Sequence, residues 1–420
     1  MILPVASISL YPLRYSIYLS EKLKNLMDML MKKKTIFLFT TFCFAFACSL
    51  YGNNFLLLFK KNITEKALNL PDPPPQQKKI KVALLLDTSN SMDGLIEQAK
   101  SQLWTIVNEL ALAKCDGIKP TIQIALYEYG NDRLNAMEGY IKMVTPLTDD
   151  LDKISEDLFK LTTNGGSEFC GHVIQTACKQ LDWSSDGNDL QVIFIAGNEP
   201  FNQGGVPYQK ACALATSKNI VVNTIYCGPY EEGIAGLWKS GADITKGNYM
   251  SIEQDRKTVY IPSPYDDKIS DLNTQLNTTY IEYGSLGKEK KIKQAEQDVN
   301  AEKYGKENKV IRAVSKSSHV YKNKSWDLVD ASDEKDFKLE QVPTSDLPQE
   351  MQSMTTVQKQ KYIETKKADR EKIKTEIYQL NMQREKYIAE QKKSEASGKS
   401  LDKAMIEAIK KQAAEKNLTF

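Results

Sequence analysis

Residues 80–94 read Ile-Lys-Val-Ala-Leu-Leu-Leu-Asp-Thr-Ser-Asn-Ser-Met-Asp-Gly, and this stretch sets the architecture of the chain. The residues before Asp87 are largely apolar, which is typical of a strand buried on both faces of a sheet. Asp87, Ser89 and Ser91 follow at alternate positions, so their side chains can converge on one point. Hard divalent cations take such oxygen ligands. We therefore expect a metal site where this strand ends.

Further apolar runs alternate with amphipathic segments as far as residue 283. Such alternation is typical of a doubly wound α/β fold, in which a mainly parallel sheet is flanked by helices. The chain is long enough for this domain and at least one further unit. We expect strands at 80–86, 121–129, 140–145, 190–196, 220–227 and 248–252, and helices at 94–113, 150–161, 169–182, 207–218, 231–241 and 265–283.

Two further loops share the polar character of the first. One reads Thr162-Thr-Asn-Gly-Gly-Ser-Glu168, and the other follows a buried strand as Gly197-Asn-Glu-Pro200. With these loops, the stretch 80–283 resembles the von Willebrand factor type A (vWA) family, a Rossmann-like α/β fold that carries a metal-ion-dependent adhesion site. The resemblance implies that Mg²⁺ or another divalent cation is bound by Asp87, Ser89, Ser91 and Ser167.

The third loop departs from the family pattern, because Gly197 stands where the family has a second aspartate. With Asp87 as the one certain carboxylate, the ion would be weakly held, since ligand charge helps to set affinity. Three nearby side chains could compensate as further metal or rim residues: Glu168, Asn198 and Glu199. A competing interpretation needs no metal. Asp87 and the serines would cap the helix that begins near Asp93, and Glu168 would favour the dipole of the next helix.

The other reactive side chains give no catalytic constellation. Cys170 and His172 lie two residues apart in one predicted helix, so they point to different faces. We therefore expect no enzymatic activity. The histidines show no metal-ligand spacing and there is no Cys-x-x-Cys pair, which argues against structural zinc. The cysteines are either disulfide partners, Cys170 with Cys178 or Cys212 with Cys227, or small buried hydrophobes.

The amino-terminal part carries the pattern of a secretion signal. Met31-Lys-Lys-Lys34 is a basic segment, and the apolar run that follows is shorter than the ~20 residues of a spanning helix. We predict an upstream extension at 1–30, a signal peptide at 31–47, and export to the periplasm or cell envelope. Ala45-Phe-Ala47 suits signal peptidase, whereas Ala47-Cys48 resembles a lipoprotein box in which Cys48 is lipidated. An uncleaved signal would act as an anchor, and residues 48–79 would form a proline-rich tether.

Beyond Gly284 the sequence is rich in helix formers and charge, which predicts a mostly helical C-terminal region at 284–420. One helical stripe is interrupted by Arg384, so a short hairpin is favoured over a long coiled coil. Its turn would lie at 394–400. The stripe of the first helix comprises Ile373, Ile377, Leu380 and Tyr387, and that of the returning helix Leu401, Met405, Ala408 and Ile409.

The charge balance restricts the function. The net charge is +2 and neither half is strongly one-signed, which argues against a nucleic-acid partner.

Three motifs, at 87–92, 164–171 and 194–201, also resemble a set of exported bacterial vWA proteins. We interpret the chain as a non-enzymatic binding protein of the cell envelope that recognises a protein partner through an acidic side chain of that partner. The alternative is a metal-free scaffold that assembles through its helical region. Membrane contact is expected only through a lipid anchor or an uncleaved signal.

Overall fold

The computed structural model describes residues 77–115, 117–253, 255, 260–391 and 400–420. The predicted signal peptide, Cys48, the tether as far as residue 76, and positions 394–399 of the predicted turn lie outside the described residues. Within the described ranges, no helix combines the length and the apolar character needed to cross a membrane.

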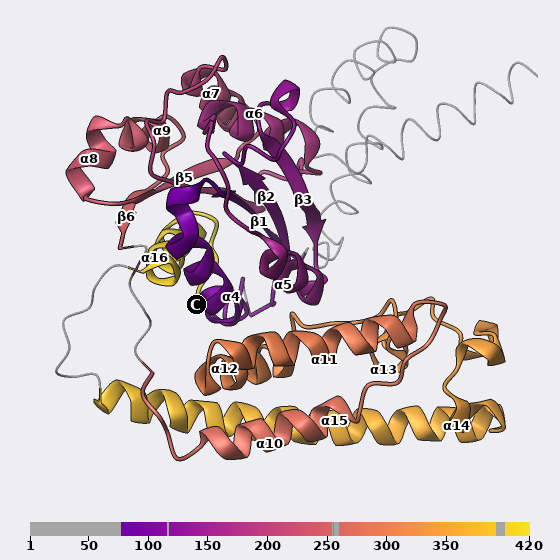
Figure 1. The fold of residues 1–420 in the computed structure, drawn as a ribbon. Helices are drawn as coiled ribbons and strands as arrows, with labels where there is room; N and C mark the ends of the chain where they lie inside the picture. Colours follow the sequence, from indigo (N-terminus) through magenta and orange to yellow (C-terminus); the bar gives the residue numbers. More distant parts are fainter. Residues whose placement is uncertain (1–76, 116, 254, 256–259, 392–399) are drawn as a thin grey trace, which may run out of the picture. The chain divides into compact units, whose positions relative to one another are not determined.

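A six-stranded sheet organises the first part of the described chain, in the order β3-β2-β1-β4-β5-β6 (Figure 1). Neighbouring strands are parallel except for β2 and β3, which are antiparallel. The strand order reverses at β1 and β4, and ligands bind at the carboxyl ends of strands at such a switch point. The strands are β1 Lys79–Asp87, β2 Thr121–Tyr129, β3 Ile141–Thr148, β4 Leu190–Gly197, β5 Val221–Cys227 and β6 Tyr249–Ile252.

Alternate residues of β1 contribute to two hydrophobic cores. Leu84 and Leu86 belong to the core formed with α4, α5 and α16. Ala83 and Leu85 belong to the core formed with α6, α7 and α9. The sheet is therefore covered on both faces, as the continuous apolar strands predict. These helices are α4 Asp93–Leu110, α5 Leu151–Lys160, α6 Cys170–Gln180, α7 Tyr208–Ser217, α9 Trp238–Ile244 and α16 Leu401–Ala414.

The single helix predicted at 231–241 is two short helices, α8 (Tyr230–Ala235) and α9. They are separated by Leu237, whose φ of 70° is incompatible with a continuous α-helix. The break lets Trp238 pack, fully buried, at 4.9 Å from the ring centroid of Phe201 and 5.9 Å from that of Tyr226. Burial of this large indole therefore overrides the helical pattern of the sequence.

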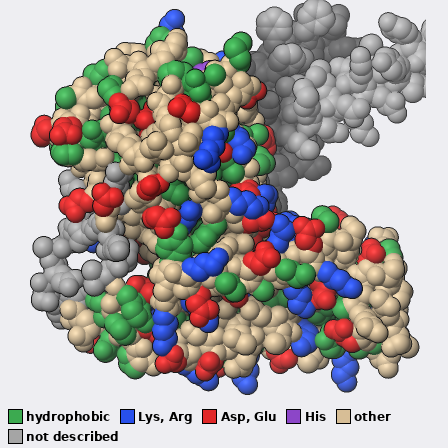
Figure 2. Space-filling view, viewed as in Figure 1, with side chains coloured by type: hydrophobic (Ala, Val, Ile, Leu, Met, Phe, Trp, Pro, Cys, Tyr) green, Lys and Arg blue, Asp and Glu red, His purple; other side chains and the backbone are tan. Residues whose placement is uncertain are grey.

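The residues after β6 form a helical region (Figure 1). On the face drawn in Figure 2, acidic and basic side chains are interspersed over its surface. Its first helix ends earlier than predicted, because Tyr280 leaves it to stack on Trp326 at 5.9 Å between ring centroids. The helices are α10 Asp266–Asn277, α11 Gly287–Lys303, α12 Lys306–Ser317, α13 Leu328–Ala331, α14 Gln349–Gln352 and α15 Thr356–Gln391.

The long helix α15 buries residues at intervals of seven: Ile363, Arg370, Ile377 and Arg384. The two arginines are neutralised inside the protein. Arg370 donates to Asp327 at 2.7 Å, and Arg384 donates to Asp266 at 3.0 Å. Arg384 therefore continues the stripe that the sequence predicts it to interrupt, because a paired charge can be buried.

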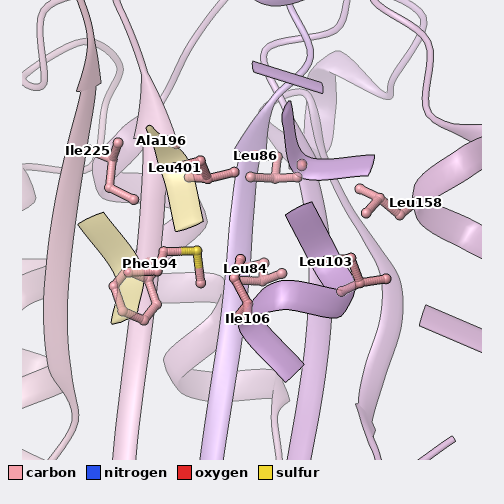
Figure 3. Close-up of a pocket in the computed structure, with 11 residues that line it drawn as sticks. Leu84, Leu86, Leu103, Ile106, Leu158, Phe194, Ala196, Ile225 and Leu401 are labelled. Atoms are coloured by element: carbon pink, nitrogen blue, oxygen red, sulfur yellow. The ribbon is translucent and has the colours of Figure 1, made fainter. Parts of the chain in front are cut away.

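The helix α16 packs against α4, β4 and β6, so the predicted hairpin with α15 is wrong. Its stripe is buried as predicted, but in the core of the sheet. Leu401 lines a narrow apolar cavity together with Leu84 and Phe194 (Figure 3). The periodicity identifies the buried face of this helix but not its partner. The predicted domain boundary at residue 283 stays a prediction, and the contacts of α16 cross it.

Hydrogen bonds of polar side chains fix the position of α16 on the sheet. Gln412 donates to Oδ1 of the buried Asn223 in β5 at 2.6 Å, and the Asn223 amide donates back at 3.1 Å. At the start of the helix, the Leu401 amide donates to Gln98 of α4 at 3.1 Å. Because a buried amide without its partner is costly, these bonds fix the register of α16 on the sheet.

We predict that Ile409→Ala in α16 destabilises the whole α/β fold. Ile409 is 1% exposed in the core shared with β1, so its truncation is expected to cost about 2–5 kcal/mol. Chemical denaturation monitored by circular dichroism measures this loss. Glu407→Ala, at a solvent-exposed position of the same helix, is the control and should change stability little. Equal stability of the two variants would contradict the seating of α16 on the sheet.

A second prediction concerns the buried arginines. Arg370→Ala leaves Asp327, which is 0% exposed, without its cationic partner. Breaking such a pair costs about 3–5 kcal/mol. The control is Lys372→Ala, an exposed position on the same helix. Thermal unfolding should show a large loss for Arg370→Ala and almost none for Lys372→Ala, and a small loss for both would contradict this account.

Candidate metal site

Three loops meet at the carboxyl end of β1: loop 1 (residues 88–92), loop 2 (161–169) and loop 3 (198–207). Backbone hydrogen bonds join the first two, from Asn90 to the Gly165 carbonyl and from Asn164 to the Thr88 carbonyl, each at 3.0 Å. Loop 3 joins them through side chains, because the Asn198 amide donates to Ser91 Oγ at 3.1 Å. The structure therefore brings together the loops that the sequence places far apart.

Asp87 lies at the centre of this site and is fully buried. Its Oδ1 accepts from the Ser89 amide at 2.8 Å, whereas Oδ2 has no hydrogen-bond partner among the described residues. Burial, and then the charge of Glu168, raise the pKa of Asp87 well above its usual value. An unsatisfied buried carboxylate oxygen is costly, and a bound cation would satisfy it.

Glu168 points into the site rather than into solvent. It is 4% exposed and lies within hydrogen-bonding range of Asp87, Ser89 and the backbone of Glu199. Burial is the largest cause of its raised pKa. The first turn of α6 contains no acidic residue, because that helix begins at Cys170. Glu168 directly precedes the N-cap Phe169, so its role at the helix dipole stays a prediction, and its carboxyl group lies close to that of Asp87.

Two serine hydroxyl groups lie together in loop 1, and a third serine lies in loop 2. Ser89 Oγ and Ser91 Oγ are 3.3 Å apart, and Ser167 is half-buried in loop 2. The N-cap residues of α4 and of the short 3₁₀ helix before it make no side-chain capping bond, so the capping interpretation of Asp87 and the serines is not supported. Within the described ranges, no group of three or more His, Cys, Asp or Glu side chains could hold a metal. Hydroxyl donors would therefore be needed, and this donor set suits Mg²⁺, Mn²⁺ or Ca²⁺.

The absence of an aspartate at position 197 is explained by Tyr129, a residue that the sequence did not identify as part of the site. A Cβ atom at Gly197 would lie 2.7 Å from Tyr129 Oη and 3.0 Å from Asp87 Oδ2. Tyr129 is fully buried, and its hydroxyl donates to the Ala196 carbonyl at 3.1 Å. Tyr129 is the register partner of Asp87 on β2, which is the signal that could have identified it. The tyrosine fills the space of the missing aspartate.

Glu199 lies on the outer rim. Its side chain is exposed and accepts from Gln203 at 3.2 Å, while its carbonyl accepts from the indole of Trp238 at 2.8 Å. The three additional candidates thus differ in position. Glu168 is inside the site, Asn198 bridges to Ser91, and Glu199 faces outward.

Cys170 and His172, the candidate nucleophile and base, have separate surroundings. The Cys170 thiol lies 3.8 Å from Tyr129 Oη, and burial raises its pKa well above the usual value. The His172 ring lies against Gly139 in the loop after β2. The four cysteines of the predicted pairs, Cys170, Cys178, Cys212 and Cys227, are free and buried. The predicted disulfide alternative is therefore wrong, and the small-hydrophobe interpretation holds for them.

Residues 81–234 match the family model of the von Willebrand factor type A domain, and this part of the chain belongs to that family. A similar solved structure is BatB from Bacteroides thetaiotaomicron, with 18% sequence identity and a TM-score of 0.32. The alignment covers 41% of this chain and 90% of that chain. Another is an aerotolerance-related membrane protein from Bacteroides fragilis, at 16% identity, TM-score 0.29, 42% of this chain and 93% of that chain. A third is proximal thread matrix protein 1 from the mussel byssus with a zinc-occupied MIDAS motif, at 15% identity, TM-score 0.32 and 43% of each chain. Curated proteins give no match.

We predict that Glu168→Gln stabilises the metal-free protein at neutral pH. The folded-state pKa values of Asp87 and Glu168 are both raised, so the pair contributes stability at low pH and loses it as the pH rises through those values. Removing one charge relieves this loss, and the melting temperature in chelator should rise by about 2 °C or more for each kcal/mol recovered. The gain should shrink towards acidic pH.

The matched control for this prediction is Glu231→Gln, which changes an exposed carboxylate on α8. Its melting temperature should follow that of the wild type across the pH series. A Glu168→Gln variant that is less stable than the wild type in chelator at neutral pH would contradict the repulsion argued for the pair.

Proposed function

We propose that this chain is a binding protein whose candidate metal site recognises a protein partner. Domains of the von Willebrand factor type A family are usually non-enzymatic binding modules and commonly mediate protein–protein interaction. The observation that carries the proposal is the unpaired Oδ2 of the buried Asp87, at the point where three loops meet.

The residues present fit a hard divalent cation. Asp87, Ser89, Ser91 and Ser167 would hold Mg²⁺ or a similar ion, with Asn198 beside Ser91. When bound, the ion would supply a coordination position for an oxygen atom from outside the chain. Ser91 is exposed, so this side of the site is open to a partner. We propose that the partner presents an acidic side chain there, since a carboxylate is a preferred ligand of such ions.

Export to the periplasm or cell envelope remains part of the proposal, with the signal pattern at 31–47 as its support. Intact-mass measurement of the mature protein would test cleavage, the start site and lipidation of Cys48 together.

The alternative scaffold function is less well supported, because the buried stripe of α15 packs against α10, α12 and α13 of the same chain. That stripe is therefore not free to assemble copies of the protein.

We predict that Mg²⁺ or Mn²⁺ raises the melting temperature of the whole protein and that Asp87→Ala abolishes the rise. A ligand that binds only the folded state stabilises it by about 2.7 kcal/mol at one hundred times its dissociation constant. A shift of about 3 °C or more at millimolar metal is expected, measured by scanning calorimetry. Glu231→Ala, at an exposed acidic position on α8, is the control and should keep the full shift.

The same variants test partner recognition. An envelope extract passed over immobilised wild-type protein should yield a bound protein that chelator releases, and Asp87→Ala should not retain it. No metal-induced shift in the wild type, or a shift of equal size in Asp87→Ala, would overturn the metal-dependent function.

A further inference from the structure

Two carboxyl groups lie together at one glycine. A Cβ atom at Gly130 would lie 2.6 Å from Asp87 Oδ1 and 2.8 Å from Glu168 Cγ. Gly130 has a φ of 77°, a conformation that glycine adopts without cost. The loop after β2 is therefore shaped so that Asp87 and Glu168 approach each other from different loops with no side chain between them.

Among the described residues, no basic side chain forms an ion pair with Asp87 or Glu168. Both carboxyl groups are buried, with Asp87 at 0% and Glu168 at 4% exposure. Asp87 Oδ2 is buried and has no donor among the described residues. Two buried like charges at such short range are costly unless a cation lies between them. A divalent ion held by both carboxylates would offset this repulsion.

The usual position for a second charged ligand is blocked. Because Tyr129 Oη would lie 2.7 Å from a Cβ at Gly197, an aspartate cannot be built at this end of β4 without moving the tyrosine. Real Cβ atoms do not approach a neighbour so closely, and Tyr129 is held by full burial and by its bond to Ala196.

We propose that Glu168 is the second charged ligand of the divalent ion. It would replace the aspartate that other family members have at the position of Gly197, where Tyr129 leaves no space for a side chain. The proposal rests on the metal-dependent function proposed above. Two carboxylates balance the charge of the ion, whereas Asp87 alone would leave it half neutralised. Loop 3 then meets the site through Asn198 and leaves the exposed Glu199 free of the ion.

The first test is Mn²⁺ binding to the whole protein, measured by electron paramagnetic resonance of the free ion and by calorimetry. Glu168→Gln should weaken binding about tenfold or more, since even indirect ligand partners contribute 10–100-fold to metal affinity. Glu199→Gln is the matched control and should bind as the wild type does. Wild-type affinity in Glu168→Gln would overturn the inference while leaving the proposed function intact. No Mn²⁺ binding by the wild type would overturn both.

The second test rebuilds the missing aspartate. In the Glu168→Gln background, Gly197→Asp alone should not restore Mn²⁺ binding, because Tyr129 Oη occupies its space. Adding Tyr129→Phe removes that oxygen and should recover at least part of the lost affinity. Full recovery by Gly197→Asp with Tyr129 intact would overturn the role of the tyrosine. If the triple variant does not fold, the comparison of Glu168→Gln with Glu199→Gln still decides the role of Glu168.

Discussion

The buried carboxylate of Asp87 is the constraint around which the loops of the α/β domain are arranged. It lies at the carboxyl end of β1, where the strand order reverses. Its Oδ1 is satisfied by the loop that follows, and its Oδ2 is not. The backbone bonds between loops 1 and 2 and the glycine at position 130 bring further oxygen atoms to the same place. In the function that we propose, a divalent cation would satisfy this arrangement.

The helical region is joined to the α/β domain by buried polar groups as well as by apolar packing. Arg312 of α12 donates to Asp152 of α5 at 2.9 Å and stacks on the ring of Trp104 in α4 at 4.5 Å. Asp298, beside Arg312 and Lys316, has its pKa lowered despite its burial, because the two cations outweigh desolvation. Such paired charges add little net stability relative to apolar packing, but removing one partner is costly, so they specify which helix lies where.

Much of the α/β domain can be predicted from the chain. Strands such as 190–196 appear as apolar runs. Two of the polar loops follow β1 and β4 at one edge of the sheet, and the third lies between α5 and α6. Asp87, Ser89, Ser91 and Ser167 are recognisable for that reason. The role of Tyr129 is not, because it depends on the register of β2 against β1. The inward position of Glu168 and the outward position of Glu199 likewise depend on the path of two loops.

The α/β architecture and the location of its site follow from local patterns, since burial on both faces of a strand leaves a continuous apolar run in the sequence. Tertiary structure decided three further features: the inward position of Glu168 and outward position of Glu199, the burial of Arg384, and the packing of α16 on the sheet. A helical stripe records that a face is buried but not what covers it. From the sequence alone a charged side chain such as Arg384 is predicted to be exposed, because its buried partner, Asp266, is distant in the chain. These features depend on contacts between residues that are distant in the chain, and local sequence carries no record of them.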